Sequence, residues 1–124
     1  MYTKEQVQEI LRDTYEVEDY CGYGESYIKI RPRIICEDGY SFSMQASNCH
    51  YSTPRENLID GKYLEVELGY PSEHDELIDD YVDYWYFDED FPLDYTESVY
   101  PYVPVEIVAA LIDKHGGNPK IKKH

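Results

Sequence analysis

The sequence predicts an α+β fold: a three-stranded antiparallel sheet, with the N- and C-terminal helices packed on one face and an acidic helix-loop insertion. Three observations lead to this fold class. Both ends of the chain have apolar residues at helical spacing, the region between them alternates polar and apolar residues, and an acidic stretch interrupts the pattern before the last helix. The 124 residues suit one domain, which we expect to span residues 1–116, followed by a basic flexible tail at 117–124.

The first predicted element is a helix from Lys4 to Thr14. Thr3 is a good N-cap, and Gln6 three residues later completes a capping box. One face of this helix is apolar and is formed by Val7, Ile10, Leu11 and Tyr15.

Three strands are expected next, at Tyr27–Cys36, Tyr40–Ser47 and Tyr63–Gly69. The second has the cleanest alternation, in which Tyr40, Phe42, Met44 and Ala46 point to the core. Pro32 marks the first as an edge or bulged strand, with Lys29, Arg31 and Arg33 on its solvent face. In the third, Leu64, Val66 and Leu68 are expected to face inward. The open face of the sheet would then be polar, lined by Ser41, Ser43, Gln45, Glu65 and Glu67.

The acidic insertion is expected to begin with a short helix. Ser72 and Asp75 form an N-cap pair before Leu77, Ile78 and Tyr81, and Asp83 to Tyr102 follows as an ordered surface loop. The last helix has Pro104 at its first position and Gly116 after its end. Its apolar face contains Val105, Val108, Ala109 and Ile112.

The strongest functional signal is the distribution of charge. Residues 63–113 contain fifteen Asp and Glu but no Lys or Arg, and the chain carries a formal net charge of −15. Such a surface repels nucleic acid and anionic membranes, and it complements a basic nucleic-acid-binding protein. The predicted partner-binding residues are Glu73, Asp75, Glu76, Asp79, Asp80, Asp83, Trp85, Asp88, Glu89, Asp90, Asp94 and Glu97.

Two other interpretations of this acidic stretch stay open. It is either a solvated surface that favours solubility, or a calcium site formed by Asp88, Glu89, Asp90 and Asp94. The second lacks the loop spacing of an EF-hand.

A second candidate site is the loop Asn48–Arg55. There His50, Ser52 and Arg55 are suited to a small anionic ligand, such as a nucleotide signal, although a purely structural turn is an alternative. A zinc site that uses Cys21, Cys36 and Cys49 lacks a Cys-x-x-Cys anchor. The odd number of cysteines favours reduced thiols. No catalytic motif occurs, so we expect no enzyme, no catalytic residue, no metal and no cofactor.

In size and composition the chain resembles small acidic phage-encoded DNA-mimic inhibitors, namely anti-CRISPR proteins, anti-restriction proteins and the uracil-DNA glycosylase inhibitor. The segments MQASNCHYSTPR (44–55), VELGYPS (66–72) and VYPYVPVEIV (99–108) are also similar to small uncharacterised proteins of phages and mobile elements. The resemblance implies an inhibitor that acts in the host bacterial cytoplasm, as a monomer or homodimer, and blocks the DNA channel of a defence nuclease such as a CRISPR effector. It assigns no functional residue.

Overall fold

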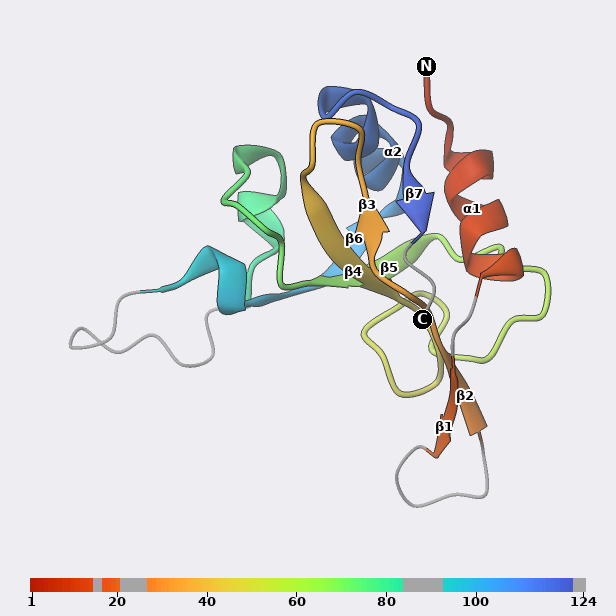
Figure 1. Ribbon diagram of the computed structural model, residues 1–124. Coiled ribbons are helices and arrows are strands. Elements are labelled where there is room, and N and C mark those ends of the chain that lie inside the picture. Colours follow the sequence, from red (N-terminus) through yellow and green to blue (C-terminus); the bar gives the residue numbers. More distant parts are fainter. Residues whose placement is uncertain (15–16, 21–26, 84–92, 122–124) are drawn as a thin grey trace.

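Figure 1 shows the computed structural model of the protein. The structure describes residues 1–14, 17–20, 27–83 and 93–121. It is an α+β fold with two α-helices and two short 3-10 helices, which are called η1 and η2. The elements are α1 (Lys4–Asp13), β1 (Val17–Tyr20), β2 (Tyr27–Ile30), β3 (Ile34–Ile35), β4 (Ser41–Gln45), β5 (Glu65–Gly69), η1 (Glu76–Tyr81), η2 (Tyr95–Glu97), β6 (Val99–Pro104), α2 (Val105–Lys114) and β7 (Lys120–Ile121).

The main sheet has five strands in the order β6-β5-β4-β3-β7, and every neighbouring pair is antiparallel. The prediction of three strands is therefore wrong in number. Both additional strands lie at the edges: β6 in the stretch expected to be a loop, and β7 in the expected flexible tail. A further pair, β1 and β2, forms a separate two-stranded sheet that projects from the main body (Figure 1).

The helices form for the reasons that the sequence indicates. The Thr3 side chain accepts a hydrogen bond from the Gln6 backbone, and the Gln6 side chain accepts one from the Thr3 backbone, which completes the capping box. The first helix ends at Asp13, one residue earlier than expected. Helix α2 begins at Val105, so Pro104 is its N-cap and the last residue of β6, one position before the predicted one. The helix is followed by Gly116 at φ 102°, a conformation that favours glycine.

A single apolar cluster joins both helices to one face of the sheet. The predicted inward residues of β4, Phe42 and Met44, are buried, and so are Val7 and Leu11 of α1 and Val108 of α2. The alternation predicted for this strand is thus confirmed. In β5, Val66 and Leu68 are buried, but Leu64 lies just before the strand and is 61% exposed, so its inward assignment is wrong.

The predicted strand Tyr27–Cys36 is divided into β2 and β3. Residues 31–33 separate them, as expected around a proline that cannot donate to a ladder. The expectation that Arg31 faces solvent is wrong, because its side chain is buried and donates to the carbonyl oxygens of Leu11 and Ala46. Within the described residues, no helix has the length and apolar character that crossing a membrane requires.

Candidate functional site

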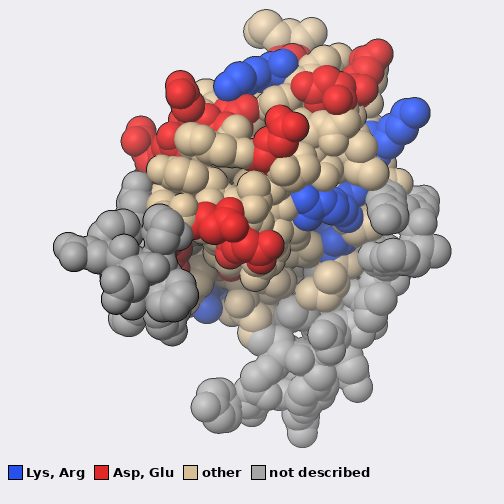
Figure 2. Space-filling model, turned by 60° about the vertical axis from the view of Figure 1, so that its left-hand side comes forward, with Lys and Arg blue, Asp and Glu red and all other residues tan. Residues whose placement is uncertain are grey.

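The acidic surface is defined here as the carboxylates carried by residues 73–83 and 94–97, around η1 and η2. Figure 2 views this side of the molecule and shows carboxylates spread over it, with Lys and Arg confined to small areas. The two segments are held together by the His74 ring, which stacks on the Tyr95 ring at a centroid distance of 3.9 Å. His74 also contacts Asp79, with 2.7 Å between Nε2 and Oδ1. The carboxylates of both segments therefore belong to one surface.

Most of the predicted partner-binding residues are accessible there. Glu73, Glu76, Asp80, Asp94 and Glu97 are exposed, and Asp79 and Asp83 are partly buried. Asp94 also caps η2, since its carboxylate accepts hydrogen bonds from the backbone and hydroxyl of Thr96. Trp85, Asp88, Glu89 and Asp90 lie outside the described residues, and the last three of these are also three of the four acids considered for calcium.

Asp75 departs from the predicted role, because only 4% of it is exposed. Its carboxylate accepts hydrogen bonds from Lys114 Nζ at 2.8 Å and from the Leu77 backbone at 2.9 Å, and it lies 2.6 Å from His115 Nε2. The other ring nitrogen of His115 is 2.7 Å from Asp38 Oδ2, and the ring stacks on Tyr40. Asp75 thus ties η1 to the end of α2 and presents no carboxylate to a partner.

Protonation of His115 strengthens its contacts with the carboxylates of Asp38 and Asp75. Burial alone would lower the pKa of His115, but its hydrogen bonds to Asp38 and Asp75 and their charges raise it overall. Burial would likewise raise the pKa of Asp75, but hydrogen bonds from Lys114, Leu77 and His115 lower it. The unfolded values are about 6.5 for His and about 3.9 for Asp. Both groups therefore contribute fully between about pH 4 and pH 6.5.

We predict that the free energy of unfolding falls as pH rises above about 6.5, because the stabilising contribution of His115 is lost as pH passes through its raised folded pKa. Urea denaturation at several pH values measures this slope. The variant His115→Gln keeps a hydrogen-bonding side chain but does not titrate, so its slope should be smaller than that of the wild type. Equal slopes would contradict the prediction.

Of the three residues of the predicted anion-binding loop, Ser52 is withdrawn from the surface, whereas His50 and the charge of Arg55 remain close enough to interact. Ser52 is 1% exposed, and its hydroxyl donates to the carbonyl oxygens of Ser47 and Pro54, so it stabilises the loop itself. Arg55 is exposed, and its guanidinium lies over the Tyr51 ring, 5.2 Å from the centroid. His50 lines a hollow on the open face of the sheet.

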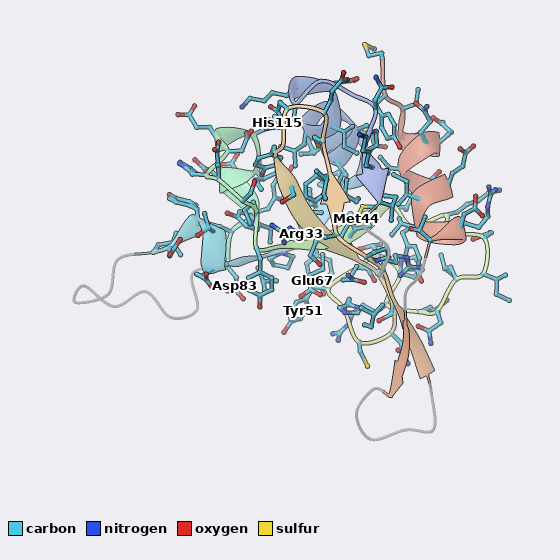
Figure 3. The ribbon with its side chains drawn as sticks, viewed as in Figure 1. Arg33, Met44, Tyr51, Glu67, Asp83 and His115 are labelled. Atoms are coloured by element: carbon cyan, nitrogen blue, oxygen red, sulfur yellow. The ribbon has the colours of Figure 1, made fainter. Side chains whose placement is uncertain are left out.

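This sheet-face hollow has a volume of about 260 Å³. Its lining residues are Ser43, Gln45, His50, Glu67, Leu68, Gly69, Tyr70 and Val99. The expected polar face of the sheet thus forms its floor. Figure 3 shows Glu67 and Tyr51 on the side of the sheet away from His115. Glu67 was predicted only as a polar residue of the sheet face. Its place in a hollow depends on the 47–55 loop, which lies over β5, and no pattern in the sequence indicates this packing.

Two tyrosines beside the hollow have unusual backbone conformations. Tyr70 and Tyr102 have φ values of 52° and 55°, in the left-handed region. For residues other than glycine this region costs about 1 kcal/mol or more, and such residues are concentrated at functional sites. Tyr70 lines the hollow, and Tyr102 packs against Tyr51 with 5.9 Å between ring centroids. Of these two tyrosines, Tyr70 is thus the one that borders the polar floor.

The cysteines differ from the expectation of three reduced thiols. Cys49 is disulfide-bonded, whereas Cys36 is a free thiol in the core. Burial and the charge of Asp38 raise the pKa of Cys36 to about 11, so this thiol is unreactive. The described residues contain no cluster of three or more metal-ligating side chains. The expectation of a reduced thiol is therefore wrong at Cys49.

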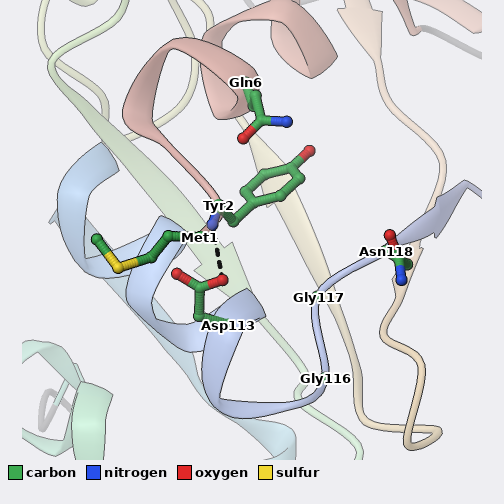
Figure 4. A pocket seen from close by; sticks show the side chains of 7 residues that line it. All are labelled: Met1, Tyr2, Gln6, Asp113, Gly116, Gly117 and Asn118. Carbon is green, nitrogen blue, oxygen red and sulfur yellow. Dashed lines mark hydrogen bonds between the residues drawn. The ribbon is translucent and has the colours of Figure 1, made fainter.

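A second hollow, of about 390 Å³, lies between the N-terminal residues and the turn after α2 (Figure 4). Its lining includes Met1, Tyr2, Gln6, two glycines and Asn118. The Asp113 carboxylate, which also lines it, accepts a 2.7 Å hydrogen bond from the Tyr2 backbone. This bond holds the N-terminal residues against α2, and we assign the hollow no ligand.

Comparisons of the chain with protein-family models, with curated proteins and with solved structures found no match.

Proposed function

We propose that this protein is an inhibitor of the phage type, which binds a basic nucleic-acid-binding protein through the acidic surface and blocks access of target DNA. A CRISPR effector of the bacterial host is the leading class of partner. One observation carries the proposal: the acidic surface is built on a stretch of 51 residues, 63–113, that contains no Lys or Arg. A surface adapted only for solubility usually mixes both signs of charge.

The exposed carboxylates give this proposal a physical mechanism. Glu73, Asp80 and Glu97 are exposed, and their side chains form no hydrogen bond or ion pair with the described residues. They are thus available to the Lys and Arg side chains that hold phosphates in a DNA channel. Binding of this kind is fast, because opposite charges steer the two proteins together, and it weakens as salt rises. The mechanism is occlusion, so no catalytic residue or cofactor is required.

We predict that the triple variant Glu73→Lys, Asp80→Lys, Glu97→Lys loses binding to the partner by at least about tenfold, since three favourable charge contacts become repulsive. Tagged protein is used to capture partners from a defence-competent bacterial lysate, with elution by salt and competition by DNA. The affinity of the captured protein is then measured for each variant.

The matched control reverses three exposed carboxylates elsewhere: Glu5→Lys, Glu9→Lys and Glu56→Lys. Both variants change the net charge by the same amount, so a loss in the first alone assigns binding to the acidic surface. Equal losses would indicate a general charge effect, and retained binding in both would refute charge mimicry. Thermal unfolding confirms that each variant is folded.

A further inference from the structure

We infer that the sheet-face hollow receives a guanidinium group, and that an arginine side chain of the basic partner supplies it. The source of the guanidinium rests on the proposed function, whereas the chemistry of the hollow does not. The inference depends on four features: an uncompensated carboxylate, a neutral histidine beside it, an aromatic wall, and the position of the hollow next to the acidic surface.

The carboxylate is that of Glu67, whose side chain is only 17% exposed. Among the described residues, no Lys or Arg nitrogen lies within 4.0 Å of it, and the nearest ionisable nitrogen is His50 Nε2 at 3.9 Å. Burial raises the pKa of Glu67, while a backbone hydrogen bond from Tyr51 and the charge of Arg55 partly oppose this. A carboxylate that has lost water without gaining a cation favours a positively charged ligand.

His50 does not supply the missing charge. Burial, together with the charges of Arg31 and Arg55, lowers the pKa of His50 to about 4, so the ring is neutral at pH 7. Its Nδ1 lies 2.7 Å from the Ser47 hydroxyl oxygen, which also accepts a hydrogen bond from the Cys49 backbone. The ring is thereby fixed in place, and Nε2 is directed toward Glu67. The His50 ring thus forms part of the wall of the hollow but carries no charge that would neutralise the Glu67 carboxylate.

The shape of the hollow favours a planar cation. Tyr70 and Val99 line it beside Glu67, and the volume of about 260 Å³ is small. A guanidinium donates two parallel hydrogen bonds to a carboxylate and stacks on aromatic rings, whereas an ammonium offers only a point charge. Tyr70, which has a φ of 52°, is 48% exposed, so its ring is accessible to such a group.

The hollow is continuous with the acidic surface. The Asp83 backbone donates a 3.0 Å hydrogen bond to Val99 O, and the Tyr70 backbone donates one of 3.0 Å to Ser98 O. Val99 and Tyr70 line the hollow, whereas Ser98 directly follows η2. A basic partner drawn to the acidic surface would therefore bring its side chains to the mouth of the hollow.

Arg55 provides a test of the sign of the ligand charge. Its charge acts on both Glu67 and His50, although its guanidinium rests over Tyr51. An incoming cation is repelled by Arg55, so Arg55→Gln should tighten its binding. An anionic ligand would be attracted by the same residue, and the variant would weaken its binding. The two classes of ligand thus give opposite results.

The experiment follows the NMR signals of the His50 ring in the full chain during titration with N-acetyl-L-arginine amide. N-acetyl-L-citrulline amide has nearly the same shape without the charge. We expect a saturable shift with the arginine compound and at least tenfold weaker binding of the citrulline compound. Glu67→Gln should weaken arginine binding at least tenfold, and Arg55→Gln should strengthen it at least twofold. Thermal unfolding checks that both variants are folded.

Equal binding of the two compounds, an unchanged affinity in Glu67→Gln, or weaker binding in Arg55→Gln would each overturn the inference. A parallel titration with a nucleoside monophosphate tests the anionic class directly, and a His50 shift that requires Arg55 would assign the hollow to anions instead.

The failure of this inference is separable from the failure of the proposed function. Arginine binding at Glu67 without any captured partner would leave the hollow as a guanidinium site and refute the inhibitor proposal. If the partner is lost in the Lys triple variant but retained in Glu67→Gln, the proposed function stands and the hollow is not its anchor.

Discussion

Replacing Arg31 with methionine is expected to lower the free energy of unfolding by about 2–6 kcal/mol, which is the cost of leaving two buried carbonyl oxygens without donors. Arg31 is only 5% exposed. Its Nε and Nη2 donate to Leu11 O at 2.9 and 2.7 Å, and its Nη1 donates to Ala46 O at 2.8 Å. Burial lowers the pKa of Arg31, but arginine keeps its charge in proteins. The variant would leave two buried carbonyl oxygens without these donors.

The position of Leu11 explains the size of this effect. It lies in the last turn of α1, where carbonyl oxygens have no partner within the helix. Arg31 therefore completes the end of the helix and joins it to the strand that follows Pro32. The Gln45 side chain holds Arg31 in turn, through hydrogen bonds to its backbone N–H and carbonyl oxygen at 2.9 and 2.8 Å.

Urea denaturation of Arg31→Met measures the loss, and Arg12→Met is the matched control. Arg12 has the same side chain but is exposed, and it pairs only with its neighbour Asp13 among the described residues. The control should denature at nearly the wild-type urea concentration. A similar midpoint for Arg31→Met would mean that the buried guanidinium does not hold the helix.

The second large effect is expected for Gly61→Ala, which should cost more than about 3 kcal/mol. Gly61 has φ 69°, and a Cβ added to it would lie 2.5 Å from Gln8 O, 2.7 Å from Arg12 N and 2.8 Å from Arg12 Cβ. Most of these atoms belong to the backbone of α1, which cannot move aside without shifting the buried residues Val7 and Leu11. The substitution therefore strains the turn and also separates the helix from the loop.

Gly117→Ala separates these two contributions. Gly117 also has φ 69°, but no atom lies within 4 Å of the added Cβ. Its substitution should cost only the left-handed strain, about 1–2 kcal/mol. The difference between the two variants in urea denaturation then measures the contact with α1. Equal costs would show that Gly61 does not lie against the helix as described.

Local signals in the sequence predict some elements well and others poorly. The capping box at Thr3 and Gln6 fixes the start of α1, and the alternation in β4 identifies its buried face, since both depend on neighbouring residues. Strand β6 contains two prolines, and its sequence therefore predicts a loop. It forms a strand because it pairs with β5, which lies in a distant part of the chain. The short β7 likewise depends on distant residues, because it pairs with β3 and its Ile121 packs against the core.

The candidate sites differ in the same way. Charge is additive along the chain, so the acidic surface follows directly from composition. Burial is not additive along the chain. For this reason the sequence predicts neither the withdrawal of Asp75 into its contacts with Lys114 and His115 nor the partial burial of Glu67. For the alternative loop site the sequence likewise does not predict that Ser52 is turned inward by hydrogen bonds to nearby carbonyl oxygens.

The edges of the main sheet have a consequence for how another molecule attaches. One edge is β6, where Pro101 and Pro104 lack N–H donors and Tyr102 departs from extended geometry, and the other is the two-residue β7. Neither edge offers the continuous row of backbone groups that a new strand requires. Recognition at the main sheet must therefore occur through side chains, and the same property protects this tyrosine-rich chain from fibrous association of its sheets.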